Sequence, residues 1–136
     1  MQKDSMNKII VNHKHRYTKE EMIIYEGQAK IVRYDDHMKI KYLENKATLV
    51  TLDVYEDKLI LNRKNQEITT NLLFINESDT SNTISSEYGD IEIMVHTYNY
   101  EKNEKNIIVE YDILSSGEQD GYEISFKIEE EDNEFN

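Results

Sequence analysis

Apolar and polar side chains alternate along most of this chain. Met38, Ile40 and Tyr42 are separated by Lys39 and Lys41, and the same period of two returns in the last third of the sequence. A period of two places apolar residues on one face of a strand and polar residues on the other. The pattern therefore predicts half-buried β-strands over nearly the whole length.

Short polar breaks, rich in the residues that favour turns, separate the alternating segments. No segment shows a helical period long enough for the crossover connection that parallel strands need. The strands should therefore follow one another as an antiparallel meander. We expect them at residues 7–16, 20–34, 37–44, 47–55, 58–64, 67–75, 80–88, 90–100, 106–115 and 121–130.

A meander of this many strands is either open, with two edge strands, or closed by pairing its first strand with its last. An open meander leaves two exposed edges that invite aggregation, and pairing the first strand with the last removes both. Gly27 interrupts the long second strand, where a bulge or bend would form a barrel corner. We expect an all-β fold, an antiparallel meander closed into a barrel of about eight to ten strands, with a two-sheet sandwich as the alternative. Residues 1–130 should form this single domain, followed by an acidic flexible tail at 131–136.

Composition narrows the choice of partners. The chain has 136 residues, a formal net charge of −12 and no cysteine. Such a charge repels nucleic-acid phosphates and anionic lipid, and no apolar run is long enough for a membrane-spanning helix. The first residues carry no apolar signal segment. We expect a cytoplasmic protein that binds neither nucleic acid nor membranes.

Several polar residues fall on the apolar faces of the predicted strands. A buried charge is costly unless it is paired, so Arg63 should pair with Glu44 or with Glu26. Two interpretations stay open. These groups could form an internal network that closes one end of the barrel, or they could line a cavity that orients a small ligand, with the Arg63 fork holding an anionic one. The inward polar candidates are Glu26, Tyr42, Glu44, Arg63, Tyr88, Thr97 and Tyr111.

Signals for catalysis or metal binding are weak. His13 and His15 share one face of a strand, but two imidazoles do not make a metal site, and the spacing demands no third ligand. The chain has no nucleophile elbow, zinc-protease motif or glycine-rich phosphate loop. A Glu26 and Glu44 pair could do acid–base work in principle. We expect no enzymatic activity, no metal and no cofactor.

Some strands carry apolar residues on both faces. If the inward assignment holds, a second set of apolar side chains lies outside, where it would form a partner surface. A homodimer is the simplest partner, and a barrel flattened into two packed sheets is the alternative. The set is Ile23, Tyr25, Ile31, Leu49, Ile60, Met94, Ile108 and Leu114.

The chain resembles the YwiB-like family of small bacterial proteins over roughly residues 27–128. The segment from Tyr88-Gly89-Asp90 to Thr97 is its most specific part, and the other matching features are Gly27, Tyr42-Leu43-Glu44, Thr51, Arg63 and Tyr111-Asp112-Ile113-Leu114. Two turn positions where the family often has glycine carry Asn65 and Ile75-Asn76 here; asparagine tolerates the positive φ that such turns need.

The resemblance implies a calycin-type, lipocalin-like barrel with an interior that can hold a ligand, and it adds Thr51 to the candidate residues. It implies no activity, because fold alone does not give function. We therefore expect a barrel that binds a small molecule in its polar-lined interior. The alternative is an interaction module that works through its outer apolar face or as a homodimer.

Overall fold

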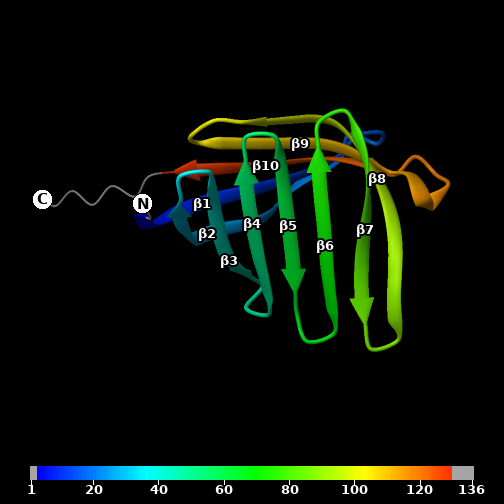
Figure 1. The fold of residues 1–136 in the computed structure, drawn as a ribbon, viewed down its shortest axis with the longest axis horizontal. Coiled ribbons are helices and arrows are strands. Elements are labelled where there is room, and N and C mark those ends of the chain that lie inside the picture. Colours follow the sequence, from blue (N-terminus) through cyan, green and yellow to red (C-terminus); the bar gives the residue numbers. More distant parts are fainter. Residues whose placement is uncertain (1–2, 130–136) are drawn as a thin grey trace, which may run out of the picture.

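The computed structural model describes residues 3–129, and Figure 1 shows them as a series of strands joined by short turns. Apart from one turn of 3-10 helix, every element is a strand. Together they form a closed antiparallel barrel in which each strand pairs with its neighbours in sequence and β1 pairs with β10. The strands are β1 (Lys3–His15), β2 (Glu21–Arg33), β3 (His37–Glu44), β4 (Thr48–Tyr55), β5 (Lys58–Lys64), β6 (Ile68–Ile75), β7 (Ser78–Ser86), β8 (Gly89–Lys102), β9 (Asn106–Ile113) and β10 (Gly121–Glu129), with the 3-10 turn η1 (Leu114–Ser116) before the last.

The all-β meander and its closure into a barrel are confirmed. Each of the ten expected strands has a counterpart, although β1 begins at Lys3, several residues before the predicted start. Closure runs from the pair Lys8 and Glu129 to the pair His15 and Tyr122, so neither end of the meander is left as an open edge. The acidic tail predicted at 131–136 lies outside the described residues.

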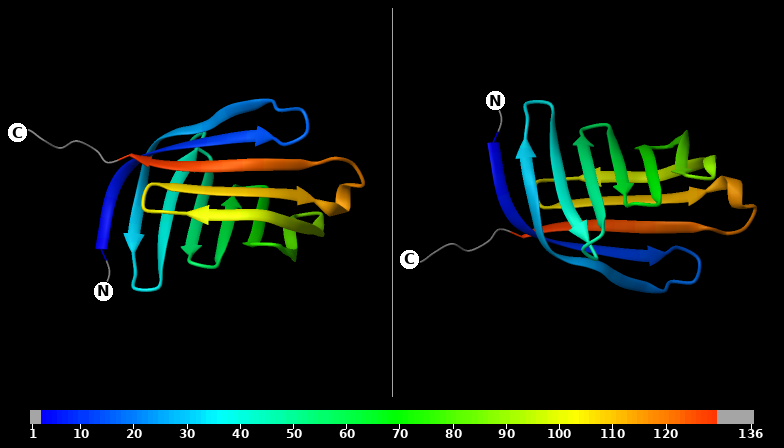
Figure 2. Two further views of the ribbon diagram at one scale, coloured as in Figure 1. Left: turned by 90° about the horizontal axis from the view of Figure 1, so that it is seen from above. Right: turned by 90° about the horizontal axis from the view of Figure 1, so that it is seen from below.

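The barrel is flattened, with two sides that cross. In Figure 2, β9 and β10 run across the direction of β3 to β6. The longest strands, β1, β2 and β8, reach 13 to 14 residues, which lets them take part in both sides, as in orthogonally packed sheets. The core between the sides is apolar, and its largest fully buried side chains include Phe74, Phe126, Ile9, Ile40 and Leu59.

A β-bulge at Ile24 reverses which face of β2 points inward. Val11 pairs with Tyr25 and Asn12 with Ile23, which leaves Ile24 without a partner. A shift of one residue moves every later side chain to the other face. Ile31 is therefore buried in the core, and Tyr25 stacks on the ring of Tyr42 at 4.5 Å. The prediction that Ile31 and Tyr25 lie outside was wrong for this reason.

Gly27 makes room for a side chain and does not carry the bulge. A Cβ atom at Gly27 would lie 2.8 Å from the hydroxyl oxygen of Tyr25, because that side chain folds over it. The hydroxyl donates a hydrogen bond to the Gln28 carbonyl at 2.6 Å. A side chain at position 27 would therefore displace the Tyr25 hydroxyl from this hydrogen bond.

A second bulge, at Tyr98 in β8, sets up a polar cluster on the outside. Thr97 pairs with Tyr111 and Asn99 with Glu110, which leaves Tyr98 unpaired. The Tyr98 hydroxyl donates to Asp112 at 2.9 Å, and the same carboxylate accepts from Tyr17 at 2.7 Å and from the Arg16 guanidinium at 2.6 Å. These bonds tie the β1–β2 turn to β8 and β9.

The wall between β6 and β7 is closed partly by side chains. Backbone pairing between these strands stops at Asn71 and Thr83. Beyond that point the Leu73 N–H donates to Asn82 Oδ1 at 2.6 Å, and Thr80 Oγ1 donates to the Leu73 carbonyl at 2.6 Å. We call the stretch joined by Leu73, Thr80 and Asn82 the side-chain seam. It keeps the barrel continuous where the two backbones separate.

Candidate functional site

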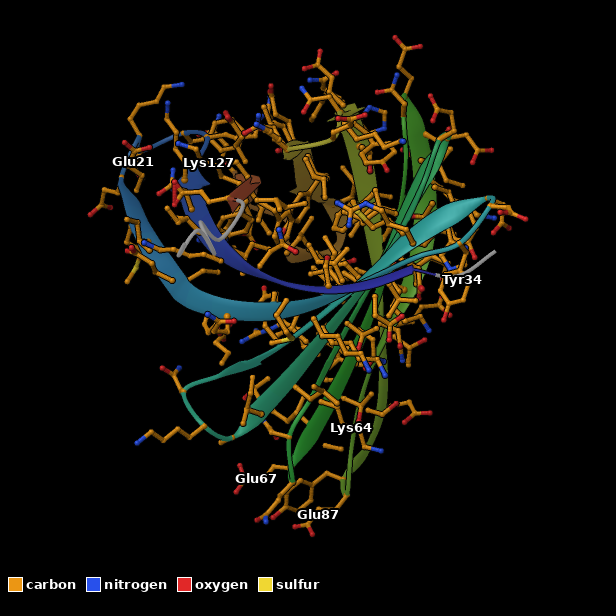
Figure 3. The ribbon with its side chains drawn as sticks, turned by 90° about the vertical axis from the view of Figure 1, so that its left-hand side faces the viewer. Glu21, Tyr34, Lys64, Glu67, Glu87 and Lys127 are labelled. Atoms are coloured by element: carbon orange, nitrogen blue, oxygen red, sulfur yellow. The ribbon has the colours of Figure 1, made fainter. Side chains whose placement is uncertain are left out.

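A cavity of about 140 Å³ opens near the end of the barrel where the β3–β4 and β5–β6 turns lie. In Figure 3 the β5–β6 and β7–β8 turns, marked by Glu67 and Glu87, stand at one end, and Tyr34 lies at the other. Side chains from β1 to β6 and from β9 and β10 line the cavity. They are Val11, His13, Ile24, Tyr42, Glu44, Val50, Leu61, Arg63, Thr70, Leu72, Tyr111, Ile124 and Phe126.

Strand register explains why distant residues meet here. Tyr42 lies opposite Val50, Val50 opposite Arg63, and Arg63 opposite Thr70. Directly opposed residues of antiparallel strands point to the same face, so this row crosses β3 to β6 along the inside of the barrel. Glu44 follows Tyr42 by two residues on the same face of β3, one step nearer the rim.

Arg63 and Glu44 form an ion pair at the mouth of the cavity. The Nη2 atom of Arg63 donates a hydrogen bond to Glu44 Oε1. The Glu44 side chain is only 7% exposed, whereas that of Arg63 is 44% exposed. Of the two expected partners of Arg63, the structure therefore selects Glu44. The cation remains accessible from solvent while it neutralises a buried carboxylate.

Two tyrosines supply hydroxyl groups to the same cavity. Tyr42 and Tyr111 are each about 5% exposed, and burial is the main cause that raises the pKa of both above the usual tyrosine range. Both hydroxyls therefore keep their protons at neutral pH. Among residues 3–129 neither hydroxyl makes a hydrogen bond, so both are free to donate to a guest.

His13 adds a titratable group to the wall. Its ring stacks on Tyr122 at 4.7 Å between centroids. Burial, followed by the nearby His15 and Arg63, lowers the pKa of His13. The imidazole is therefore mostly neutral at pH 7 and presents one N–H donor and one acceptor.

Three predicted interior residues lie elsewhere. Glu26 is outside, paired with Lys8 at 2.9 Å, because the bulge at Ile24 reverses the alternation of β2. Thr51 faces outward between Lys41 and Asn62, since its neighbours Val50 and Leu52 point into the core. Tyr88 is 92% exposed in the β7–β8 turn, where β7 has ended and its alternation no longer applies.

Thr97 is inside the barrel but does not line this cavity. It is fully buried, and within the described residues its Oγ1 atom has no hydrogen-bond partner. Sequence reasoning overlooked Thr70, although the period of two places it on the same face as Leu72 and Phe74. It also overlooked the buried polar residues Thr80 and Asn82, which the alternation of β7 would have placed inward.

The remaining surface offers shallower depressions. One of about 270 Å³ lies around the β2–β3 and β8–β9 turns, and one of about 280 Å³ lies outside the side-chain seam. In residues 3–129 there is no group of three or more histidine, cysteine or acidic side chains placed to hold a metal ion. In the same range no helix is long and apolar enough to cross a membrane.

Fold and cavity together define a closed ten-stranded antiparallel barrel with a partly polar pocket at one end. The profile of the family described as "Domain of unknown function (DUF1934)" matches residues 9–128, and the chain belongs to this family. No curated protein matches the sequence.

A solved structure supports the same assignment. The crystal structure of the ywiB protein from Bacillus subtilis resembles this chain with a TM-score of 0.68, 12% sequence identity, and coverage of 96% of this chain and 93% of that one. At this identity the likeness shows the fold alone. The profile match and this shared fold together confirm the predicted membership of a YwiB-like family, whereas the calycin or lipocalin label stays a prediction.

Proposed function

We propose that this barrel binds a small molecule in the cavity beside Arg63 and Glu44. The observation that carries the proposal is that the hydroxyls of Tyr42 and Tyr111 line that cavity and have no hydrogen-bond partner among residues 3–129. Among the described residues the only fully enclosed side-chain atom without a partner is Thr97 Oγ1, so the two tyrosine hydroxyls open onto the cavity space and lack only a protein partner. Two donors without one, beside an accessible guanidinium, are typical of groups that meet a ligand or ordered water.

The size of the cavity limits what it holds. A cavity of about 150 Å³ accommodates benzene, so the 140 Å³ beside Arg63 suits a molecule of similar size whose polar end faces the mouth. Ligand pockets combine apolar walls with a few polar groups that fix orientation. Val50, Leu61 and Phe126 supply such walls here.

Native mass spectrometry of the protein as purified from cells tests the proposal. We expect a fraction of the chain to carry a small noncovalent mass that is absent under denaturing conditions. Tyr111→Phe should reduce that fraction, because it removes a donor and keeps the ring. Tyr88→Phe is the matched control, since that side chain is exposed. A wild-type chain with no bound mass, together with small-molecule NMR screening that shifts no cavity amide, would refute the proposal.

Self-association is the second candidate function. Leu43 and Leu49 are directly opposed on the outside of β3 and β4, with exposures of 51% and 43%. An apolar pair of this kind suits a contact between two copies. Sedimentation velocity should then show a dimer that Leu43→Lys converts to monomer. A strict monomer at high concentration would remove this candidate. A cytoplasmic location likewise stays a proposal.

A further inference from the structure

The polar groups of the cavity are unequally divided between donors and acceptors. Arg63 carries five N–H donors, and Glu44 accepts from one of its nitrogens. The hydroxyls of Tyr42, Tyr111 and Thr70 add further donors. Among the described lining residues Glu44 is the only carboxylate, and Arg63 already neutralises it. The cavity therefore suits a guest rich in acceptors.

The donor side chains reach the cavity from opposite sides of the barrel. Arg63 and Thr70 are directly opposed across β5 and β6, and Tyr42 belongs to the same row of the barrel wall. Tyr111 reaches the cavity from β9 on the other side, and the charge of Arg63 acts on the pKa of both tyrosines, against the stronger effect of burial. Donors thus approach one volume from two sides of the flattened barrel.

We propose that the ligand is a small monocarboxylate with an apolar body. Its carboxylate lies between the Arg63 guanidinium and the hydroxyls of Tyr42 and Tyr111, and its body fills the space toward Phe126. This inference rests on the proposed function and specifies its ligand. A carboxylate presents two oxygens with about four acceptor positions, which matches the surplus of donors, and guanidinium binds it in a planar fork.

The acidic character of the whole chain does not exclude an anion. The net charge is −12, but salt screens exposed charges beyond about 8 Å at physiological ionic strength. The ligand carboxylate would contact the Arg63 guanidinium directly, well within this distance, whereas exposed acidic groups farther away are screened. The acidic surface therefore slows association more than it weakens the bound state.

His13 gives the same site a dependence on pH. His15 on its own strand and Arg63 act on its charge, and Tyr122 of β10 stacks on its ring. The other titratable groups in the lining of the same cavity are Glu44, Tyr42 and Tyr111. Its partner on β2 is the uncharged Met22. Protonation of His13 adds a positive charge beside Arg63. Because the pKa of His13 lies below the ordinary imidazole value of 6.5, carboxylate affinity should rise as pH falls below 6.5, and His13→Gln should flatten that rise.

Benzoate and benzamide form a matched pair of probes, because they share a shape and differ in charge. Titration of the full chain, followed by amide NMR shifts, should show benzoate binding at least tenfold more tightly at pH 6.5. Arg63→Met should abolish the difference. Arg63→Lys should retain part of it, and this variant keeps the test valid if Arg63→Met fails to fold. The control Arg33→Met, on a residue outside this cavity, should leave the preference unchanged.

The outcomes separate this inference from the proposed function. Benzamide binding as tightly as benzoate at the cavity amides would overturn the carboxylate assignment and leave the binding function standing. If neither probe shifts any cavity amide at millimolar concentration, and no bound mass is found on the protein from cells, both proposals fail. A preference for benzoate that survives Arg63→Met would also overturn the assignment.

Discussion

Replacing Asn82 with alanine should weaken the barrel far more than an ordinary asparagine substitution would. The side-chain amide of Asn82 is buried, accepts from the Leu73 N–H at 2.6 Å, and donates to the Thr80 carbonyl at 3.2 Å. Alanine leaves the Leu73 N–H without its partner, which costs about 1–3 kcal/mol for a buried group, and removes a further hydrogen bond worth about 1 kcal/mol. Water from the depression outside the seam can replace part of this, so we expect a loss of about 2 kcal/mol.

Asn71 provides a matched control. It is an exposed asparagine on the same strand as Leu73, and its amide bonds to that of Asn62 on the surface. Asn71→Ala should change stability by less than about 0.5 kcal/mol, as is usual for surface positions.

Urea unfolding followed by circular dichroism measures both variants. With a slope of about 1.5 kcal/mol per molar urea, the midpoint of Asn82→Ala should fall by more than about 1 M relative to Asn71→Ala. Hydrogen exchange should show the Leu73 amide losing protection in Asn82→Ala alone. Equal midpoints for the two variants, with an unchanged Leu73 amide, would refute the assignment of the side-chain seam as a structural joint.

Three further predictions address the remaining features. Burial raises the pKa of Tyr42 and Tyr111 above the ordinary 10.0, so the unfolded chain releases these protons at lower pH than the folded chain does. The free energy of unfolding should therefore fall as pH rises above 10. Urea titrations of the variant with both tyrosines replaced by phenylalanine should show a shallower fall. Gly121→Ala should lower stability by about 1–3 kcal/mol, since its Cβ would lie 2.0 Å from Asp112 Oδ1; a thermal midpoint equal to wild type would contradict this. Tyr88→Ser should alter neither stability nor probe binding, because the side chain is 92% exposed, and a measurable loss in either would show that its placement is wrong.

The period of two predicted which polar residues face the interior wherever a strand stays regular. Tyr42, Glu44, Arg63 and Tyr111 lie on uninterrupted stretches of β3, β5 and β9, and the structure brings them to one cavity. The alternation within one strand does not show which residues of two strands lie opposite each other. The sequence therefore predicted Glu26 and Glu44 equally well as partners of Arg63.

The failures have local causes. A bulge adds one residue without changing the hydrophobic character of the strand, so nothing in the run around Ile24 shows where its alternation reverses. The prediction that Tyr88 faces the interior was wrong because it extended the alternation of β7 into a turn. The side-chain seam was missed because hydrogen bonds between an amide side chain and a neighbouring backbone leave no periodic signal.

Closure of the barrel by its first and last strands has a consequence for how the chain folds. Every other pairing joins consecutive strands, whereas Lys8 must find Glu129 across almost the entire described chain. The entropy of bringing such distant segments together grows with their separation, and long-range contacts of this kind slow folding. During synthesis β1 can pair with β2 early, but its other partner, β10, leaves the ribosome last. The emerging protein therefore carries an unpaired strand edge on β1 for most of its translation. A chaperone or a neighbouring nascent chain would contact that edge first.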